Sequence, residues 1–316
     1  MIKFMKLRKL GLLFLIMIFC FEVNVVAFEV SVNGSCQIDG VEYPGVGFGT
    51  YPLQDEICEQ AVMDAANLGY RIIDTATFYE NFIPIGKVLN LMGRQKFYVI
   101  SKVWPDAQTP TLMVEDLKRT LNQLETTYLD AYLLHWPNST IPIEDTLQTM
   151  EELRSAGLVR HIGLSNVNIN HLKRALEVGI PISWVQIELH PLFCDFTLLK
   201  YCQENEITVQ AWAPLGRGRI SDDIFLVNLG IKYGKSASQV AIKWILQHGC
   251  IPLPGSKNKK HMQKNLEVND FTISAADMKE IDERAGIGKR ERITEDIGLG
   301  FTDEFDFSYE ACWPKQ

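Results

Sequence analysis

The sequence predicts an α/β protein with the fold of a (β/α)8 barrel, the TIM barrel, in a single domain. Short apolar segments alternate with longer segments of helical periodicity, and eight such pairs follow one another along the 316 residues. The apolar segments are hydrophobic on both faces, which is typical of parallel strands covered by helices. Eight units in one chain favour a closed barrel over an open, doubly wound sheet.

The elements are expected in strict alternation. The strands are runs of four to six mostly apolar residues, at 46–50, 71–74, 97–102, 131–135, 161–165, 184–187, 208–212 and 250–253. Helical periodicity of apolar residues predicts helices at 56–68, 83–91, 112–125, 143–156, 169–177, 197–204, 221–248 and 259–266, the seventh being strongest at 237–248. Several of these helices are followed directly by glycine, the residue that most often ends a helix.

A short hairpin is expected before the first strand. Segments 29–31 and 37–42 flank Asn33-Gly34, a dipeptide typical of tight turns, and the hairpin is expected to close the bottom of the barrel. No linker rich in Pro, Ser or Gly divides the chain. We therefore expect one barrel domain over 28–316, in which 288–316 forms a C-terminal tail or loop.

Residues 1–27 have the pattern of a secretory signal peptide. Four basic side chains within the first nine residues precede the apolar run 10–21, and Val25 and Ala27 provide the small residues of a cleavage site. The apolar run is shorter than the roughly 20 residues of a membrane span. We therefore expect the secretory pathway, either secretion or the lumen of the endoplasmic reticulum. The alternative is a signal anchor, with membrane association only if the leader is uncleaved.

Composition restricts the classes of partner. The formal net charge is −8, and because the leader is basic the remaining chain is more acidic still, which argues against nucleic acid as a partner. Cysteines and histidines do not follow the spacing of a metal site, so no metal is expected. Six of the seven cysteines lie outside the leader without any C-x-x-C pair, and buried thiols are favoured over disulfides.

Polar side chains occupy the C-terminal ends of successive predicted strands. Asp74, Lys102 and His135 end the second, third and fourth strands, and Tyr79 follows the second. In a TIM barrel these ends form the active-site face. A polar group at one strand end could be a surface residue, but such groups recurring at the same end of many strands predict a site. The later strands add Ser165, Asn166, Gln186, Trp212 and Ser256.

The motifs around these residues resemble those of the aldo-keto reductases. In chain order they are Gly69-Tyr-Arg-Ile-Ile-Asp-Thr-Ala-Thr-Phe-Tyr-Glu-Asn81, Ser101-Lys-Val-Trp104, Leu133-Leu-His-Trp-Pro137, Ile162-Gly-Leu-Ser-Asn166 and Val185-Gln-Ile-Glu-Leu-His-Pro191. The resemblance runs from about residue 47 to residue 277 and so covers most of the chain. It implies an enzyme that reduces aldehydes or ketones to alcohols with NAD(P)H, and a monomer.

The resemblance also implies catalytic roles. Tyr79 matches the general acid that protonates the developing alkoxide. Because a free phenol has a pKa of about 10, it is a poor acid at neutral pH, and Lys102 matches the lysine whose charge lowers that pKa. Asp74 matches the carboxylate that fixes this lysine. His135 matches the residue that orients the substrate carbonyl, and no covalent step is implied.

The nicotinamide end of a cofactor site follows from the same resemblance. Ser165, Asn166 and Gln186 match the residues that hold the carboxamide, and Trp212 stands where an aromatic side chain stacks on the nicotinamide ring. The first strand contributes Gly49, Thr50 and Tyr51. A small carbonyl substrate is expected among Tyr51, Trp104, His135 and Trp136.

The adenosine end departs from the pattern of many members. Leu215 matches the segment over the pyrophosphate, and Asn265 matches the residue that contacts adenine. Ser256 and Lys257 occupy the segment that selects the 2′-phosphate, but a glycine precedes them and His261 replaces the usual arginine. NADPH is the preferred cofactor and NADH the alternative. A redox-sensing module that binds the cofactor with little turnover is the alternative function, and a barrel glycosidase is disfavoured because paired carboxylates are lacking.

Overall fold

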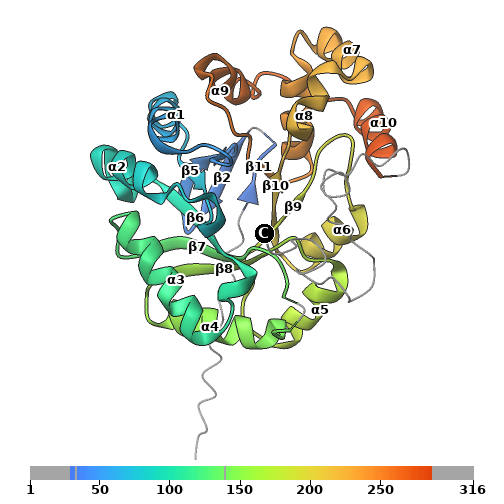
Figure 1. Ribbon diagram of the computed structural model, residues 1–316. Helices are drawn as coiled ribbons and strands as arrows, with labels where there is room; N and C mark the ends of the chain where they lie inside the picture. Colours follow the sequence, from blue (N-terminus) through green and yellow to red (C-terminus); the bar gives the residue numbers. More distant parts are fainter. Residues whose placement is uncertain (1–28, 33, 139, 287–316) are drawn as a thin grey trace, which may run out of the picture.

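The computed structural model describes residues 29–32, 34–138 and 140–286, and it forms a barrel of parallel strands within a ring of helices (Figure 1). The predicted leader, the tail at 288–316 and one residue of each of the two glycosylation sequons (Asn33-Gly-Ser and Asn138-Ser-Thr) lie outside the described residues. In the described part of the chain, none of the helices has the length and apolar character needed to cross a membrane.

Eight strands pair in chain order, each parallel to the next. They are β4 (Phe48–Gly49), β5 (Ile72–Asp74), β6 (Tyr98–Val103), β7 (Leu129–Leu134), β8 (Val159–Ser165), β9 (Trp184–Glu188), β10 (Thr208–Trp212) and β11 (Ile251–Pro252). The helices between and after them are α1 (Asp55–Leu68), α2 (Phe82–Met92), α3 (Pro110–Gln123), α4 (Ile143–Ser155), α5 (Ile169–Glu177), α6 (Phe196–Glu204), α7 (Ile224–Tyr233), α8 (Ala237–Gln247), α9 (Lys259–Leu266) and α10 (Ala275–Gly286). The predicted (β/α)8 barrel is confirmed.

The barrel closes where its first strand meets its last. The amide of Gly47 donates to the carbonyl of Pro252 at 3.0 Å, and the amide of Gly49 donates to that of Pro254 at 3.2 Å. The two chain segments approach too closely here for a side chain. A Cβ atom on Gly49 would lie 2.7 Å from the carbonyl oxygen of Leu253, and one on Gly255 would lie 2.7 Å from that of Gly49.

The interior of the barrel is apolar in its lower part. Ile72, Tyr98, Ile100, Leu133 and Trp184 form one buried cluster there, and they come from strands β5, β6, β7 and β9. Side chains alternate between the two faces of a strand. The residue two positions further along each strand therefore faces the same interior, closer to the C-terminal end of the strand.

A small antiparallel sheet closes the bottom of this interior. It consists of β1 (Glu29–Val30), β2 (Ser35–Ile38) and β3 (Val41–Pro44), in the order β1-β2-β3. Cys36 and Ile38 of β2 are buried within the interior cluster. The predicted hairpin is therefore confirmed, and it is extended by a second turn at Asp39–Gly40, where both residues have positive φ.

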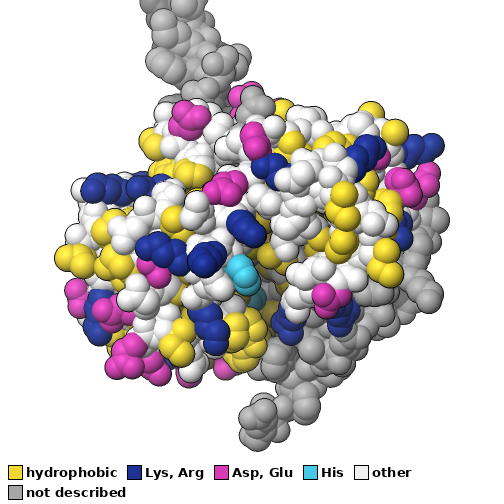
Figure 2. Space-filling view, turned by 90° about the horizontal axis from the view of Figure 1, so that it is seen from above, with side chains coloured by type: hydrophobic (Ala, Val, Ile, Leu, Met, Phe, Trp, Pro, Cys, Tyr) yellow, Lys and Arg dark blue, Asp and Glu magenta, His cyan; other side chains and the backbone are white. Residues whose placement is uncertain are grey.

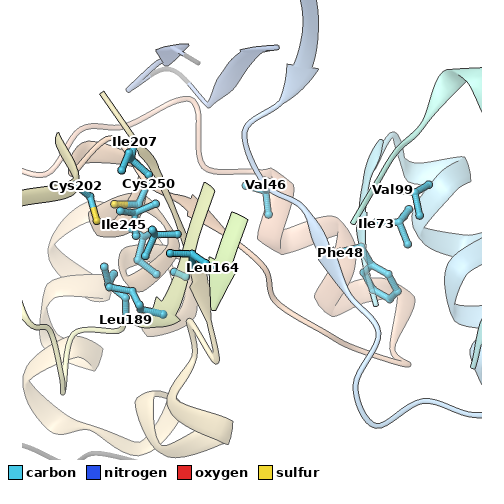
Figure 3. Close-up of a cluster of buried hydrophobic side chains, with 14 of the residues drawn as sticks. Val46, Phe48, Ile73, Val99, Leu164, Leu189, Cys202, Ile207, Ile245 and Cys250 are labelled. Atoms are coloured by element: carbon cyan, nitrogen blue, oxygen red, sulfur yellow. The ribbon is translucent and has the colours of Figure 1, made fainter. Parts of the chain in front are cut away.

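A second apolar core lies between the barrel and its helices. Figure 3 shows part of it, including Cys202 of α6, Ile245 of α8, and Cys250 just before β11. The five cysteines among the described residues are all buried and unpaired, as expected: Cys36, Cys58, Cys194, Cys202 and Cys250. Burial raises the pKa of the Cys58 thiol and of the Cys202 thiol to about 12.

Two helical predictions need correction. The region 221–248 is not one helix, because α7 ends at Gly234 with φ +65 and α8 starts afresh at Ser236, whose hydroxyl accepts from the amide of Gln239. Helix α10 was not predicted. The side chain of Ser274 accepts from the amide of Asp277 at 3.2 Å, which is a capping pattern of the kind that marks a helix start.

Gly49→Ala tests the seam of the barrel, which is the close approach of residues 47–49 to residues 252–255. We expect a loss of about 2–3 kcal/mol in the free energy of unfolding, because the added methyl group meets a backbone carbonyl that cannot move away. Gly157→Ala is the control: that position has φ +75 and no atom near the added carbon, so only the left-handed backbone costs free energy, about 1 kcal/mol. Urea unfolding of both variants measures the difference. Equal losses would contradict the close approach at the seam.

Candidate active site

The site is built around a buried ion pair at the top of the barrel interior. Lys102 follows Ile100 on the inner face of β6, and its ammonium donates to the Asp74 carboxylate at 2.8 Å and to the carbonyl of Thr75 at 2.9 Å. The lysine side chain is wholly buried. Burial lowers the pKa of Lys102, and the Asp74 carboxylate opposes this change. The two charges therefore depend on each other.

Two glutamines extend the ion pair across the barrel. The second oxygen of Asp74 accepts from the side-chain amide of Gln186 at 2.8 Å, and the same amide nitrogen donates to the Gln210 side chain at 2.9 Å. Gln186 and Gln210 are partners in the register of β9 and β10, so both face the interior at the same level. Both hydrogens of the Gln186 amide are thereby used within the protein, whereas its oxygen accepts no hydrogen bond from any of the described residues.

Tyr79 reaches the ion pair from the loop after β5. The ammonium of Lys102 lies 3.4 Å from the tyrosine hydroxyl and 5.0 Å from the centre of its ring. Burial raises the pKa of Tyr79 well above its usual range, and the Asp74 carboxylate adds to this effect, which Arg217 opposes. Desolvation of the phenolate is the largest influence on this pKa, and the expected lowering by Lys102 stays a prediction. Tyr79 is a protonated phenol at neutral pH.

His135 stands beside Tyr79 at the end of β7. Its ring centre lies 5.7 Å from that of Tyr79 and 4.9 Å from that of Trp104, with the rings edge to face in both pairs. Burial lowers the pKa of His135 well below its usual range, and the charge of Lys102 lowers it further. The imidazole is therefore neutral. Its Nδ1 atom is buried and has no hydrogen-bond partner among the residues that the structure describes.

Asn166 ends β8 in the left-handed region, with φ +57. Its amide nitrogen donates to the backbone carbonyl of His135 at 2.9 Å and to the Ser165 hydroxyl at 3.1 Å. Its oxygen accepts from the indole of Trp212 at 2.8 Å. The predicted residues of strands β7, β8 and β10 are thus joined in one network.

Aromatic side chains surround Tyr79 and His135. Tyr51 is 5.1 Å from Tyr79 between ring centres, and Phe78 stacks on Trp104 at 4.2 Å. Trp136 is buried, and its backbone carbonyl accepts from the side chain of Gln108 at 2.8 Å. Tyr51 and Phe78 are exposed, so this side of the site faces solvent.

The predicted adenosine residues lie apart from this network, on and before α9. Ser256 accepts from the amide of Asn258 at 3.0 Å, Lys257 and His261 are exposed, and Asn258 caps the helix. The face seen in Figure 2 gathers several Lys and Arg side chains near its middle. Asn265 differs from the others because it is buried.

Comparison with known proteins gives this arrangement a family. The sequence profile of the Aldo/keto reductase family matches residues 45–285. The chain belongs to the aldo-keto reductases. Its site therefore belongs to an oxidoreductase that reduces carbonyl groups with NAD(P)H.

Individual relatives are similar over most of their length. The glyoxal reductase of Bacillus subtilis (strain 168) is 34% identical over 259 residues, which is 81% of this chain and 92% of that protein. The 9,11-endoperoxide prostaglandin H2 reductase of Trypanosoma cruzi (strain CL Brener) is 36% identical over 252 residues, 78% of this chain and 89% of that protein. The structure of the aldose reductase from Schistosoma japonicum superimposes with a TM-score of 0.77 at 30% identity, covering 86% of this chain and 96% of that one.

Sequence reasoning missed several residues that support the site of this aldo-keto reductase. The amide of Asn81, fully buried, donates to the hydroxyl of Thr50 at 3.1 Å and to the carbonyl of Leu53 at 3.0 Å, while its oxygen accepts from Thr75 at 2.6 Å. It thereby fixes the loop after β4. Gln210 could have been found, because it is the inward residue two positions before Trp212.

Asp74→Asn tests the mutual dependence of the two charges. Breaking a buried pair costs about 3–5 kcal/mol at neutral pH. Without the carboxylate, burial lowers the pKa of Lys102 further from its unfolded value of 10.5. Between the two values the unfolded chain binds more protons, so the stability of the variant should rise from pH 7 to pH 9 relative to wild type. Asp74→Asn/Lys102→Met is the control and should lack this rise in urea unfolding; a rise that persists would refute the explanation.

Proposed function

We propose that this aldo-keto reductase reduces small aldehydes or ketones with NADPH, and that Tyr79 supplies the proton. The contact that supports this proposal most directly is the hydrogen bond between the buried Lys102 ammonium and the Tyr79 hydroxyl, at 3.4 Å. A carbonyl carbon that accepts a hydride leaves an oxygen that needs a proton. A protonated phenol backed by an ammonium is suited to give that proton.

The polar atoms left free in the network fit a primary carboxamide. The side-chain amide of Gln186 donates both of its hydrogens to protein groups, and so does that of Asn166. Each amide can therefore bind a ligand only through its oxygen. The Ser165 hydroxyl accepts from Asn166 and keeps its own proton to donate. One donor and two acceptors match the C=O and NH2 groups of nicotinamide. When bound there, the reduced cofactor supplies the hydride.

The protein groups then act in sequence. His135 is neutral, so it can donate one hydrogen bond to the substrate oxygen without adding a charge. The Nδ1 atom of His135 is buried and has no hydrogen-bond partner among the described residues. This fits the tautomer in which Nδ1 is unprotonated and Nε2 carries the proton. As negative charge develops on the substrate oxygen, the Tyr79 proton passes to it. The phenolate that remains is stabilised by the Lys102 ammonium, whose charge Asp74 maintains.

The choice of NADPH depends on positive groups near the start of α9. Lys259 pairs with Asp64 of α1 at 2.9 Å, so its charge is already neutralised within the protein. Lys257, Lys260 and His261 have no ion-pair partner among the described residues, and all three side chains are exposed at or just before the start of α9. These groups support a 2′-phosphate site, with NADH as the alternative.

Substrate size is inferred from the aromatic surroundings and from the relatives. Phe78, Trp104 and Tyr51 surround the two reacting side chains and leave an apolar site, which suits a small carbonyl compound. The glyoxal reductase of Bacillus subtilis and the methylglyoxal reductase DkgA of Salmonella typhimurium, 34% identical, act on small dicarbonyls by name. We therefore include such dicarbonyls among the proposed substrates. The active form is proposed to be a monomer, as the family resemblance implies.

Tyr79→Phe tests the proton donor. NADPH or NADH oxidation is followed at 340 nm with glyoxal, methylglyoxal and simple aldehydes and ketones, and we expect kcat to fall by more than 100-fold in the variant. Binding of NADPH, measured by fluorescence quenching, should be retained, because only one hydroxyl is lost. Wild-type protein that binds NADPH and turns over none of these carbonyls would instead favour a redox-sensing module. Equal turnover by both proteins would remove Tyr79 as the acid.

Residues 1–27 lead us to propose a location in the secretory pathway. A lumen that holds NADPH, such as that of the endoplasmic reticulum, is compatible with both the leader and the reductase. We expect the full chain, expressed with a C-terminal tag, to fractionate with luminal or secreted proteins, and a chain lacking residues 2–27 to stay in the cytosol. Recovery of the full chain from the cytosol with its leader intact would refute the proposal.

A further inference from the structure

The indole of Trp212 is connected to the substrate side of the site through one asparagine. Trp212 Nε1 donates to Asn166 Oδ1 at 2.8 Å, and Asn166 Nδ2 donates to the backbone carbonyl of His135 at 2.9 Å. The connection crosses three strands, because Trp212 ends β10, Asn166 follows β8, and His135 follows β7. Nothing in the family resemblance of Trp212, which concerns stacking alone, requires this path.

The hydrogen bond from Trp212 decides which way the Asn166 amide faces. An amide side chain can turn over and exchange its oxygen with its nitrogen. With an indole N–H opposite, only the oxygen end is favourable, because the reversed amide would set two donors against each other. The nitrogen end is therefore directed at the His135 carbonyl and the Ser165 hydroxyl.

The backbone of Asn166 adds a second constraint. Its φ of +57 is a conformation that asparagine adopts more easily than most residues, and its amide donates to the carbonyl of Gln186 at 3.0 Å. The residue is also 5% exposed, so water does not readily replace the protein partners of its side chain. A fixed backbone and a fixed amide together hold the carbonyl of His135 in place.

We propose that Trp212 is a positioning residue for His135, acting through Asn166. Trp212, proposed to stack on the nicotinamide, and His135, proposed to orient the substrate carbonyl, thereby keep a fixed position relative to each other. This inference rests on the proposed function. It predicts that loss of the indole N–H weakens catalysis in a way that loss of stacking area alone does not.

A double-mutant cycle on kcat, at saturating NADPH with methylglyoxal, tests the connection. Trp212→Phe keeps an aromatic ring and removes the N–H, whereas Asn166→Asp keeps the acceptor and removes the donor to His135. We expect each single variant to lower kcat about tenfold, and the double variant to be no worse than the poorer single variant, because both break one path. A loss of about 100-fold in the double variant, the product of the two, would overturn the proposal.

The control pair is Tyr51→Leu with Asn166→Asp. The Tyr51 ring lies 5.1 Å from the Tyr79 ring between centres, and among the described residues no hydrogen bond or ring contact joins Tyr51 to Asn166 or His135. The effect of Tyr51→Leu on kcat should multiply with that of Asn166→Asp. The melting temperatures of all variants are measured as well: a purely structural role would make the non-additivity appear in stability and leave the kcat effects multiplicative.

The same cycle is run on the dissociation constant of NADPH, because this separates the inference from the proposed function. If wild type binds NADPH but reduces none of the carbonyls, the proposed function fails while the connection stays testable. Asn166 Oδ1 accepts from Trp212 and has a second lone pair, which under the proposed function binds the carboxamide, so Trp212→Phe and Asn166→Asp should then be non-additive in NADPH affinity. Multiplicative effects on that affinity would overturn the connection in its own right.

Discussion

The buried Lys102–Asp74 pair is the interaction on which the rest of the site depends. The barrel interior below it is apolar and both side chains are buried, so the described residues around the pair offer neither charge a second ionic partner. Both carboxylate oxygens of Asp74 accept a hydrogen bond, one from Lys102 and the other from Gln186. The Lys102 ammonium also contacts the Tyr79 hydroxyl. The pair thus contacts the Tyr79 hydroxyl on one side and fixes the orientation of the Gln186 amide on the other.

Strand periodicity explains why the sequence revealed so much of this site. Asp74, Lys102 and His135 each follow an inward apolar residue by two positions, so a correct strand assignment places all three at one end of one interior. The structure brings these residues together with Tyr79, Ser165, Asn166, Gln186 and Trp212, as expected. Tyr79 follows β5 and does not lie on a strand, so its position after the strand placed it near the site, but only the family resemblance gave it the role of acid.

Other features depend on distances that no sequence pattern contains. The pKa of Tyr79 is raised because the phenol is buried, and burial of a loop residue is not visible in periodicity. Lys259 pairs with Asp64, a residue far away in the chain, so among the three lysines at positions 257, 259 and 260 one is already held by a carboxylate. The hydrogen bond between Trp212 and Asn166 joins two strands that are not neighbours in the sheet. Helices α7 and α8 were merged because their apolar residues stay in phase across a short break.

The closure of the barrel between its first and last strands also affects folding during synthesis. Strand β4 contains Phe48 and Gly49, and its second partner arrives only with Pro252 and Pro254. A ribosome adds roughly 5–20 residues per second, so the first strand waits on the order of 10–40 s with one edge unpaired. An unpaired strand edge can pair with another chain. The growing polypeptide therefore needs protection during that interval, and the two glycines that allow the final approach decide whether the ring can shut.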